Sequence, residues 1–245
     1  DKEEDLLEIV NNPLKEDQKN KLFAGEFDHL RSYFEEIEKS SRLVTAQDKT
    51  IYSLLRPERL LELIYNFIVY DAGIKKIARY QQFFVIKSTL RRITRVNEDN
   101  NRSGGVIWHT QGSGKSLTMV MLARAICLSS SNKDLAIKNP RLILVTDRND
   151  LDEQLGNTFL SCGMEKVRAT SGKKLIEHLK NKKQVITTLI HKFDKAFSSE
   201  KFIDESRNIF VLVDESHRTN FGSFSARMHQ MLPNSCYIGF TGTPL

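Results

Sequence analysis

The feature that most constrains the fold of this chain is a glycine-rich loop between a strand-like run and a helix-like run. The loop spans residues 109–116, follows the apolar run 105–108 and precedes a helical pattern at 117–123. A loop in this context binds nucleotide phosphates. Gly112 and Gly114 let backbone N–H groups converge on phosphate oxygens without interference from a Cβ atom. The pattern predicts that Lys115 reaches the β- and γ-phosphates and that the Ser116 hydroxyl holds Mg²⁺ at a helix N-terminus.

The loop departs from the usual phosphate-loop pattern at its first position. The pattern G-x-x-x-x-G-K-[ST] has glycine or alanine where this chain has His109. The remaining Gly-x-Gly-Lys-Ser core and the flanking strand and helix patterns still favour nucleotide binding over a chance match.

A second motif follows a strongly apolar run about a hundred residues downstream. The run 209–213 is typical of a parallel strand buried on both faces, and it ends in Asp214 and Glu215. Two carboxylates at the end of a buried strand are costly unless they bind a cation or do chemistry. In a phosphate-loop enzyme the first holds Mg²⁺ and the second positions or deprotonates the attacking water. The alternative is a strand that runs into a solvated turn.

The sequence from residue 105 onward alternates between strand and helix patterns. We predict strands at 106–109, 141–146, 185–188, 209–213 and 236–240, and helices at 115–128, 151–161, 171–180 and 223–231. This alternation predicts an α/β fold with a parallel sheet covered by helices on both faces. Its ligand site would lie at the carboxyl ends of the strands, where Lys115, Asp214 and Thr241 would converge.

The chain before this region is polar and mostly helical in pattern. Residues 1–50 show only a weak helical pattern around 27–37, and longer helices are predicted at 54–69 and 74–96. Residues 74–96 carry seven basic side chains and no acidic ones. This stretch is compatible with a polyanionic partner and equally with a solvated helix face.

The bulk properties indicate a protein of a reducing compartment. The three cysteines are far apart and match neither a zinc spacing nor a disulfide framework. The chain has no run of 18 apolar residues, so no membrane span is predicted, and its acidic N-terminus does not read as a signal peptide. We therefore expect a cytoplasmic location.

Three motifs in order resemble motifs I, II and III of superfamily 2 helicases and translocases: Gly112-Ser113-Gly114-Lys115-Ser116, Asp214-Glu215-Ser216-His217 and Thr241-Gly242-Thr243-Pro244. More closely, the runs 107–116 and 213–219 resemble the restriction (motor) subunit of type I restriction enzymes, which carries histidine at the first loop position. Further matches lie at 56–61, 79–84, 145–155, 187–193 and 239–245. The resemblance covers about residues 54–245 and implies a RecA-like phosphate-loop domain.

The resemblance also implies residue roles. ATP would be bound by Gln82, Gln111, Gly112, Ser113, Gly114, Lys115 and Ser116, with Gln82 reading the adenine and Gln81 as the alternative. Catalysis would rest on Lys115, Asp214 and Glu215, and Mg²⁺ on Ser116 and Asp214. His217, Thr241 and Thr243 would couple the nucleotide to DNA grip, and Thr146, Arg148, Thr188 and Lys192 would contact the DNA backbone. Each role has a structural alternative. Gln82 or Gln81 would then be a surface glutamine, residues 241–244 a simple turn, and Arg148 and Lys192 solvated surface charges.

The family implies a larger parent protein, an ATP-driven double-stranded DNA translocase and endonuclease that assembles with modification and specificity subunits in a bacterium or archaeon. We expect this chain to be a fragment, because 245 residues leave no room for a second motor lobe and no nuclease motif is found. Residues 1–97 would be the mostly helical linker after the nuclease domain, and 98–245 the first motor lobe. Such a fragment would hydrolyse ATP poorly, because it lacks the arginine that the second lobe supplies. Other open readings are another superfamily 2 translocase of repair or remodelling, a small-molecule phosphate-loop kinase and a non-catalytic scaffold.

Overall fold

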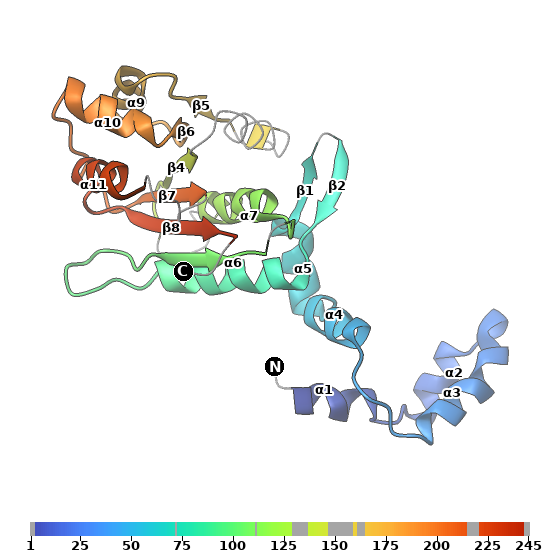
Figure 1. Cartoon of the computed structure of the whole chain (residues 1–245). Coiled ribbons are helices and arrows are strands. Elements are labelled where there is room, and N and C mark those ends of the chain that lie inside the picture. The colour runs from blue at the N-terminus through green and yellow to red at the C-terminus, as the bar shows by residue number, and fades with distance from the viewer. Residues whose placement is uncertain are drawn as a thin grey trace. The chain divides into compact units, whose positions relative to one another are not determined.

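The computed structural model describes residues 3–71, 73–110, 112–128, 137–146, 159–160, 165–214 and 221–242. The chain divides into two compact units, residues 1–62 and 63–245, which are described one at a time. Figure 1 labels the helices and strands of both.

The first unit consists of short helices. These are α1 (Glu3–Val10), α2 (Glu16–Leu22), the 3-10 helix η1 (Gly25–Leu30), α3 (Arg31–Glu38), α4 (Ala46–Leu54) and the start of α5 (Pro57–Asn66). The start of α4 shows how they are defined locally: the Thr45 hydroxyl accepts from the Asp48 N–H, and the Asp48 carboxylate accepts from the Thr45 N–H. This reciprocal cap satisfies two amides that a helix start leaves without partners. The mostly helical character predicted for this region is confirmed.

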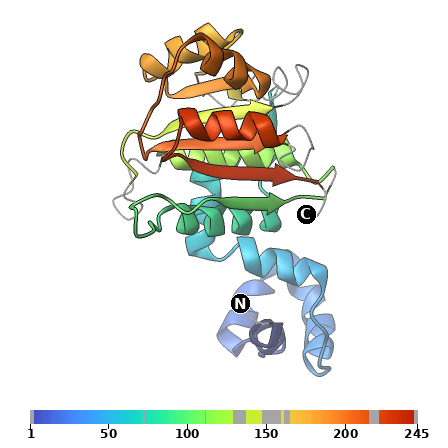
Figure 2. The same ribbon diagram turned by 60° about the vertical axis from the view of Figure 1, so that its left-hand side comes forward.

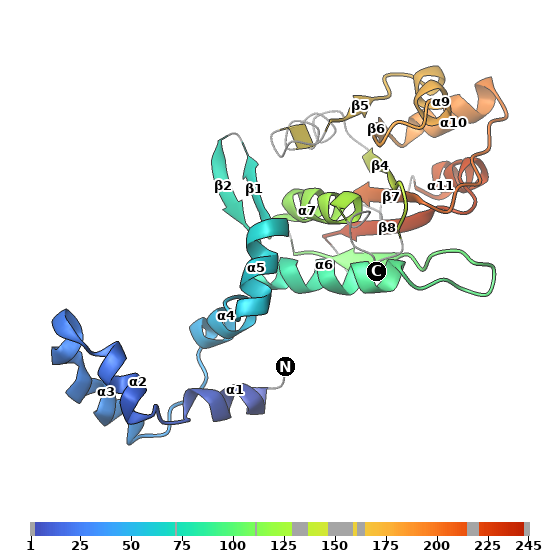
Figure 3. The same ribbon diagram turned by 180° about the vertical axis from the view of Figure 1, so that it is seen from behind.

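After the end of α5, the second unit contains a β-hairpin that was not predicted from the sequence. Strands β1 (Ile68–Asp71) and β2 (Ile74–Ile77) pair antiparallel, where helices had been predicted over 54–69 and 74–96. The turn uses Gly73 at φ +78°, a conformation that favours glycine and ends any helix. The hairpin is joined to α7 by a hydrogen bond from the Arg124 guanidinium to the Ile68 carbonyl, and Figure 3 shows the two beside each other.

Helix α6 (Tyr80–Ile93) is the part of the predicted second helix that forms. It buries Gln82, Phe83, Ile86, Thr89, Leu90 and Ile93. Phe84 of the same helix is 38% exposed. The helix is shorter than predicted, because residues 74–77 at the start of the predicted range form strand β2 instead.

The centre of the second unit is a six-stranded sheet of β3 (Gly105–Trp108), β4 (Arg141–Thr146), β5 (Val167–Arg168), β6 (Val185–Leu189), β7 (Ile209–Asp214) and β8 (Cys236–Thr241). The strands lie in the order β3-β8-β7-β4-β6-β5, and every neighbouring pair is parallel. Figure 2 shows their arrows pointing the same way. All five strands predicted for this sheet are present, and of its six strands only the two-residue β5 was not predicted.

Helices cover both faces of this sheet. Figure 2 shows α11 (Phe221–Met231) in front of the strands and α7 (Lys115–Leu128) behind them. One core layer joins β4, β6 and β7 to α9 (Gly172–Lys180), α10 (His191–Ser199) and α11, through residues such as Val211, Phe193 and Met231. Alternate residues of the same strands, including Leu144 and Leu212, are buried against the other face. Helix α10 had not been predicted, and most of the helix predicted at 151–161 lies outside the described residues.

The α/β fold class is confirmed, and the parallel sheet with the glycine loop after β3 is RecA-like. In the part of the chain that the structure describes, no helix is long and apolar enough to cross a membrane. Cys127 and Cys236 form no disulfide, and Cys162 lies outside the described residues. Burial raises the pKa of Cys127 to about 11 and that of Cys236 to about 12, so both thiols are protonated near pH 7.

Candidate functional site

The candidate site is built at the carboxyl ends of β3, β7 and β8. Trp108, the last residue of β3, pairs with Thr241 of β8, and Asp214, the last residue of β7, pairs with Phe240. The His109 N–H donates to the Thr241 carbonyl at 2.8 Å, which carries the pairing into the glycine loop. The three predicted positions therefore meet at one edge of the sheet, as the alternation had indicated.

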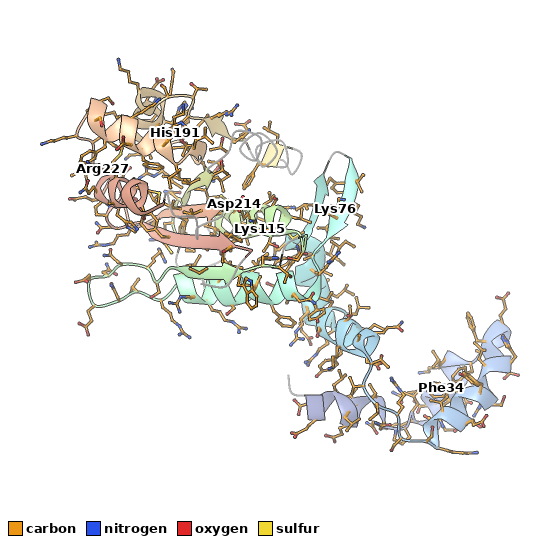
Figure 4. The ribbon with its side chains drawn as sticks, viewed as in Figure 1. Phe34, Lys76, Lys115, His191, Asp214 and Arg227 are labelled. Atoms are coloured by element: carbon orange, nitrogen blue, oxygen red, sulfur yellow. The ribbon has the colours of Figure 1, made fainter. Side chains whose placement is uncertain are left out.

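An ion pair links the two main motifs at this edge. The Lys115 Nζ lies 2.9 Å from Asp214 Oδ1, and the side chains are 20% and 2% exposed. Figure 4 shows them side by side although one begins α7 and the other ends β7. A buried carboxylate needs a positive or hydrogen-bonding partner, so the fold has placed a cation against Asp214.

The glycine loop adopts a tight turn. The Ser113 N–H donates to the Thr110 carbonyl at 3.1 Å, and Gly112, inside this turn, has φ +76°. Gly114 has φ +90° and leads into α7, whose first amides have no acceptor within the helix. Backbone donors and the positive end of a helix dipole therefore meet here, which is the arrangement that binds phosphate.

Gln82 of α6 forms hydrogen bonds to the end of this loop and to the first turn of α7. Its Nε2 donates to Thr118 Oγ1 at 3.0 Å and to the Gly114 carbonyl at 3.3 Å, and its Oε1 accepts from the Arg79 N–H at 2.9 Å. A Cβ added at Gly114 would lie 2.9 Å from the same Nε2. Gln82 is 4% exposed, and its amide is engaged on both sides within the protein.

His109 forms a second attachment within the loop. Its Nδ1 lies 2.6 Å from Ser113 Oγ, and this hydroxyl donates to the Thr110 carbonyl at 2.5 Å. His109 is 8% exposed. Burial, followed by the nearby Lys115 ammonium, lowers the pKa of His109 below its ordinary value, so the ring is neutral near pH 7.

A cavity of about 370 Å³ lies beside the loop. It is lined by Arg79, Gln81, Gln82, Val85, Trp108, His109, Thr110 and Ser113. Trp108 is 62% exposed, with its indole Nε1 3.4 Å from the Gly242 carbonyl, and Gln81 is also exposed. An aromatic ring, an exposed amide and the phosphate loop therefore border one space.

The described residues fit a magnesium ion. Mg²⁺ takes oxygen ligands, usually one or two side chains together with substrate phosphates. The Asp214 carboxylate already lies against a cation, and the Ser116 hydroxyl is in the first turn of α7, one residue from Lys115. Across the described ranges, no group of three or more His, Cys, Asp or Glu side chains could hold a metal without a substrate.

The other predicted site residues divide into three groups. Gln111, Arg148, Glu215, His217 and Thr243 lie outside the described residues. The side chains of Thr146, Thr188 and Thr241 are buried, at 1%, 0% and 1% exposure. Lys192 is partly exposed in the first turn of α10, just after the carboxyl end of β6.

The sequence reading missed two contributors to this site. Thr118 receives the Gln82 amide, and its position four residues after Gly114 in a helical pattern would have placed it on the loop side of α7. Trp108 was predicted only as a strand residue, but it also borders the cavity. An aromatic residue at the exposed end of an edge strand was the available signal.

Comparisons with known proteins identify a family and relatives for this chain. The family model of the SWI2/SNF2 ATPase matches residues 81–245. The chain is 33% identical to the type I restriction enzyme HindI endonuclease subunit of Haemophilus influenzae, over 86% of this chain and 22% of that protein. It is 28% identical to the type I restriction enzyme SsaAORF53P endonuclease subunit of Staphylococcus saprophyticus, over 90% of this chain and 23% of that protein.

Among solved structures, the SWI2/SNF2 ATPase core of Sulfolobus solfataricus in complex with dsDNA is 14% identical, with a TM-score of 0.49 over 74% of this chain and 34% of that one. The chain spans about a fifth of the length of the curated relatives that it matches.

Proposed function

Since the chain belongs to the SWI2/SNF2 ATPase family, with type I restriction endonuclease subunits among its relatives, we propose that it binds ATP and Mg²⁺ as half of a DNA-translocating motor. The site is the carboxyl edge of the sheet, between the glycine loop and the end of β7.

The observation that carries this proposal is the 2.9 Å ion pair between Lys115 and Asp214. These residues are 99 positions apart, and they come from the two motifs that a phosphate-loop ATPase needs. Had the fold placed them on different sides of the sheet, no shared triphosphate site could exist.

The side chains divide the work in ATP hydrolysis. Lys115, 20% exposed, can exchange part of its pairing with Asp214 for the β- and γ-phosphates, and the loop amides hold the same oxygens. Asp214 and Ser116 would hold Mg²⁺, which when bound neutralises charge that develops on the phosphates. Glu215 would orient and deprotonate the attacking water.

We place the adenine in the cavity beside the loop. Gln82 borders this cavity, but its amide is engaged by Arg79, Gly114 and Thr118. Gln81 is exposed on the same rim, so it is the better placed of the two candidates for reading the base edge. Trp108 offers an aromatic face on which a base can stack.

For the longer protein we propose ATP-dependent translocation on double-stranded DNA coupled to DNA cleavage, in a complex with modification and specificity subunits. The similarity to type I restriction enzyme endonuclease subunits supports the restriction activity. In this proposal residues 98–245 form the first motor lobe and 1–97 the linker from a nuclease domain. His217, Thr241 and Thr243 couple nucleotide state to DNA grip, and the complex works in the cytoplasm.

The test is ATP hydrolysis by the longer protein that contains this chain, measured with and without double-stranded DNA. We expect Mg²⁺-dependent turnover that rises when DNA is added, because translocation couples the two ligands. A purified protein that binds DNA but neither binds nor hydrolyses ATP would contradict the proposal. Phosphotransfer to a small molecule without DNA stimulation would favour a kinase.

DNA contact is expected to depend on Lys192 more than on the two threonines predicted with it. The hydroxyls of Thr146 and Thr188 are buried in the sheet, whereas Lys192 is partly exposed at the same edge. Lys192→Glu should weaken DNA binding by roughly 3- to 10-fold at low salt and less at high salt, because one phosphate contact is lost.

The measurement is fluorescence anisotropy of labelled duplex DNA with the longer protein, over a range of salt concentrations. Lys201→Glu is the control, because it makes the same charge change beyond the other end of α10. Equal effects of the two substitutions would indicate a general charge effect and not a contact at Lys192.

A further inference from the structure

The unusual first residue of the phosphate loop has a structural partner. Position 109 holds histidine where the general pattern has glycine or alanine, residues without a side chain that can form a hydrogen bond. His109 is 8% exposed and lies 2.6 Å from the Ser113 hydroxyl through Nδ1. Because the side chain is buried and its polar contact is short, His109 contributes to the structure of the loop.

The hydrogen-bond network fixes which ring nitrogen carries the proton. The Ser113 hydroxyl has one hydrogen, and the 2.5 Å contact with the Thr110 carbonyl uses it, because two oxygens this close need a proton between them. The hydroxyl can then only accept from His109. Nδ1 is therefore the protonated nitrogen of the neutral ring, and Nε2 carries the lone pair.

The network closes the turn that shapes the loop. The Thr110 carbonyl accepts from both the N–H and the hydroxyl of Ser113, so both of its lone pairs are occupied. The His109 ring donates to the Ser113 hydroxyl, and the backbone N–H of His109 donates to the Thr241 carbonyl of β8. The turn around Gly112 is thus attached to the sheet by a chain of hydrogen bonds.

We propose that His109 is a positioning residue of the nucleotide site: its Nδ1–H holds Ser113 against Thr110 and keeps the phosphate loop in its binding shape before the nucleotide arrives. This inference rests on the proposed ATP site. A loop that is already ordered loses less conformational freedom on binding, so the effect falls on nucleotide affinity. His109 does not touch the reacting atoms, and the hydrolysis step itself should change little.

The test compares substitutions at position 109 in the longer protein. His109→Ala should raise the Kd for a fluorescent ATP analogue and the KM for ATP by roughly 5- to 10-fold, the worth of one buried hydrogen bond, with kcat within about twofold. His109→Asn should restore most of the affinity, because its amide N–H falls near the place of Nδ1. His109→Gln, whose amide falls near Nε2 instead, should resemble His109→Ala.

A double-mutant cycle tests the partner. Ser113→Ala should weaken binding about as much as His109→Ala, and the double variant should be no worse than either single one, because both remove the same bond. Effects that multiply in the double variant, or asparagine and glutamine variants with the same affinity, would overturn the inference.

Lys115→Ala, measured in parallel, separates this inference from the proposed function. If Lys115→Ala still binds and hydrolyses ATP like the wild type, the site itself is wrong. If Lys115→Ala abolishes hydrolysis while His109→Ala binds the analogue normally, only the role of His109 is wrong. The asparagine and glutamine comparison remains informative even if His109→Ala does not fold, because both replacements keep a polar side chain of intermediate size.

Discussion

Lys115→Ala is expected to reduce DNA-stimulated ATP hydrolysis by the longer protein by roughly 10²- to 10³-fold or more, the loss typical when a group that stabilises transition-state charge is removed. The ammonium is the cation that the fold places 2.9 Å from Asp214, at the edge where the glycine loop begins α7. Without it, neither the phosphates nor the carboxylate keeps its positive partner. The measurement is steady-state phosphate release at saturating ATP and duplex DNA.

Lys174→Ala is the matched control for this experiment. It removes the same side chain from an exposed pair with Glu177 on α9, so ATP hydrolysis should stay at the wild-type level. Glu215→Gln offers a contrast, because we expect it to lose hydrolysis while retaining nucleotide binding. Wild-type turnover in Lys115→Ala would count decisively against the motor proposal.

Gly172→Ala is expected to destabilise the chain, although helix propensity alone favours the change. Gly172 begins α9, where it lies against α10. A Cβ atom there would lie 2.5 Å from the Ala196 nitrogen and 2.7 Å from the carbonyl carbon of Lys195. These are backbone atoms, so α9 and α10 must separate, at a cost of about 1–3 kcal/mol that outweighs the gain in propensity.

Thermal unfolding of the chain, followed by circular dichroism, measures this effect. We expect the midpoint to fall by about 3–8 °C for a unit of this size. Lys173→Ala, at the next and exposed position of α9, should shift it by less than about 2 °C. A midpoint that rises in Gly172→Ala would show that the helices tolerate the added methyl group.

Local patterns predicted most of the second unit. Five of the six strands from β3 to β8 were recognised, because buried parallel strands are short apolar runs and that signal lies within four to eight residues. The glycine loop and the Asp214 motif were recognised because each is also a pattern of neighbouring residues. The hairpin at 68–77 was not, because two four-residue strands resemble a helical pattern until their pairing with each other is known.

The candidate site shows the same division. The sequence by itself determined the α/β alternation, the phosphate-loop motif and the carboxylate that follows a buried strand, since each is written in neighbouring residues. Only the tertiary structure decided that Lys115 pairs with Asp214, that the Gln82 amide is engaged and that Thr146 and Thr188 are buried. These facts depend on contacts between segments up to about a hundred residues apart, and such contacts follow from how the strands order themselves in the sheet and how the helices pack on it.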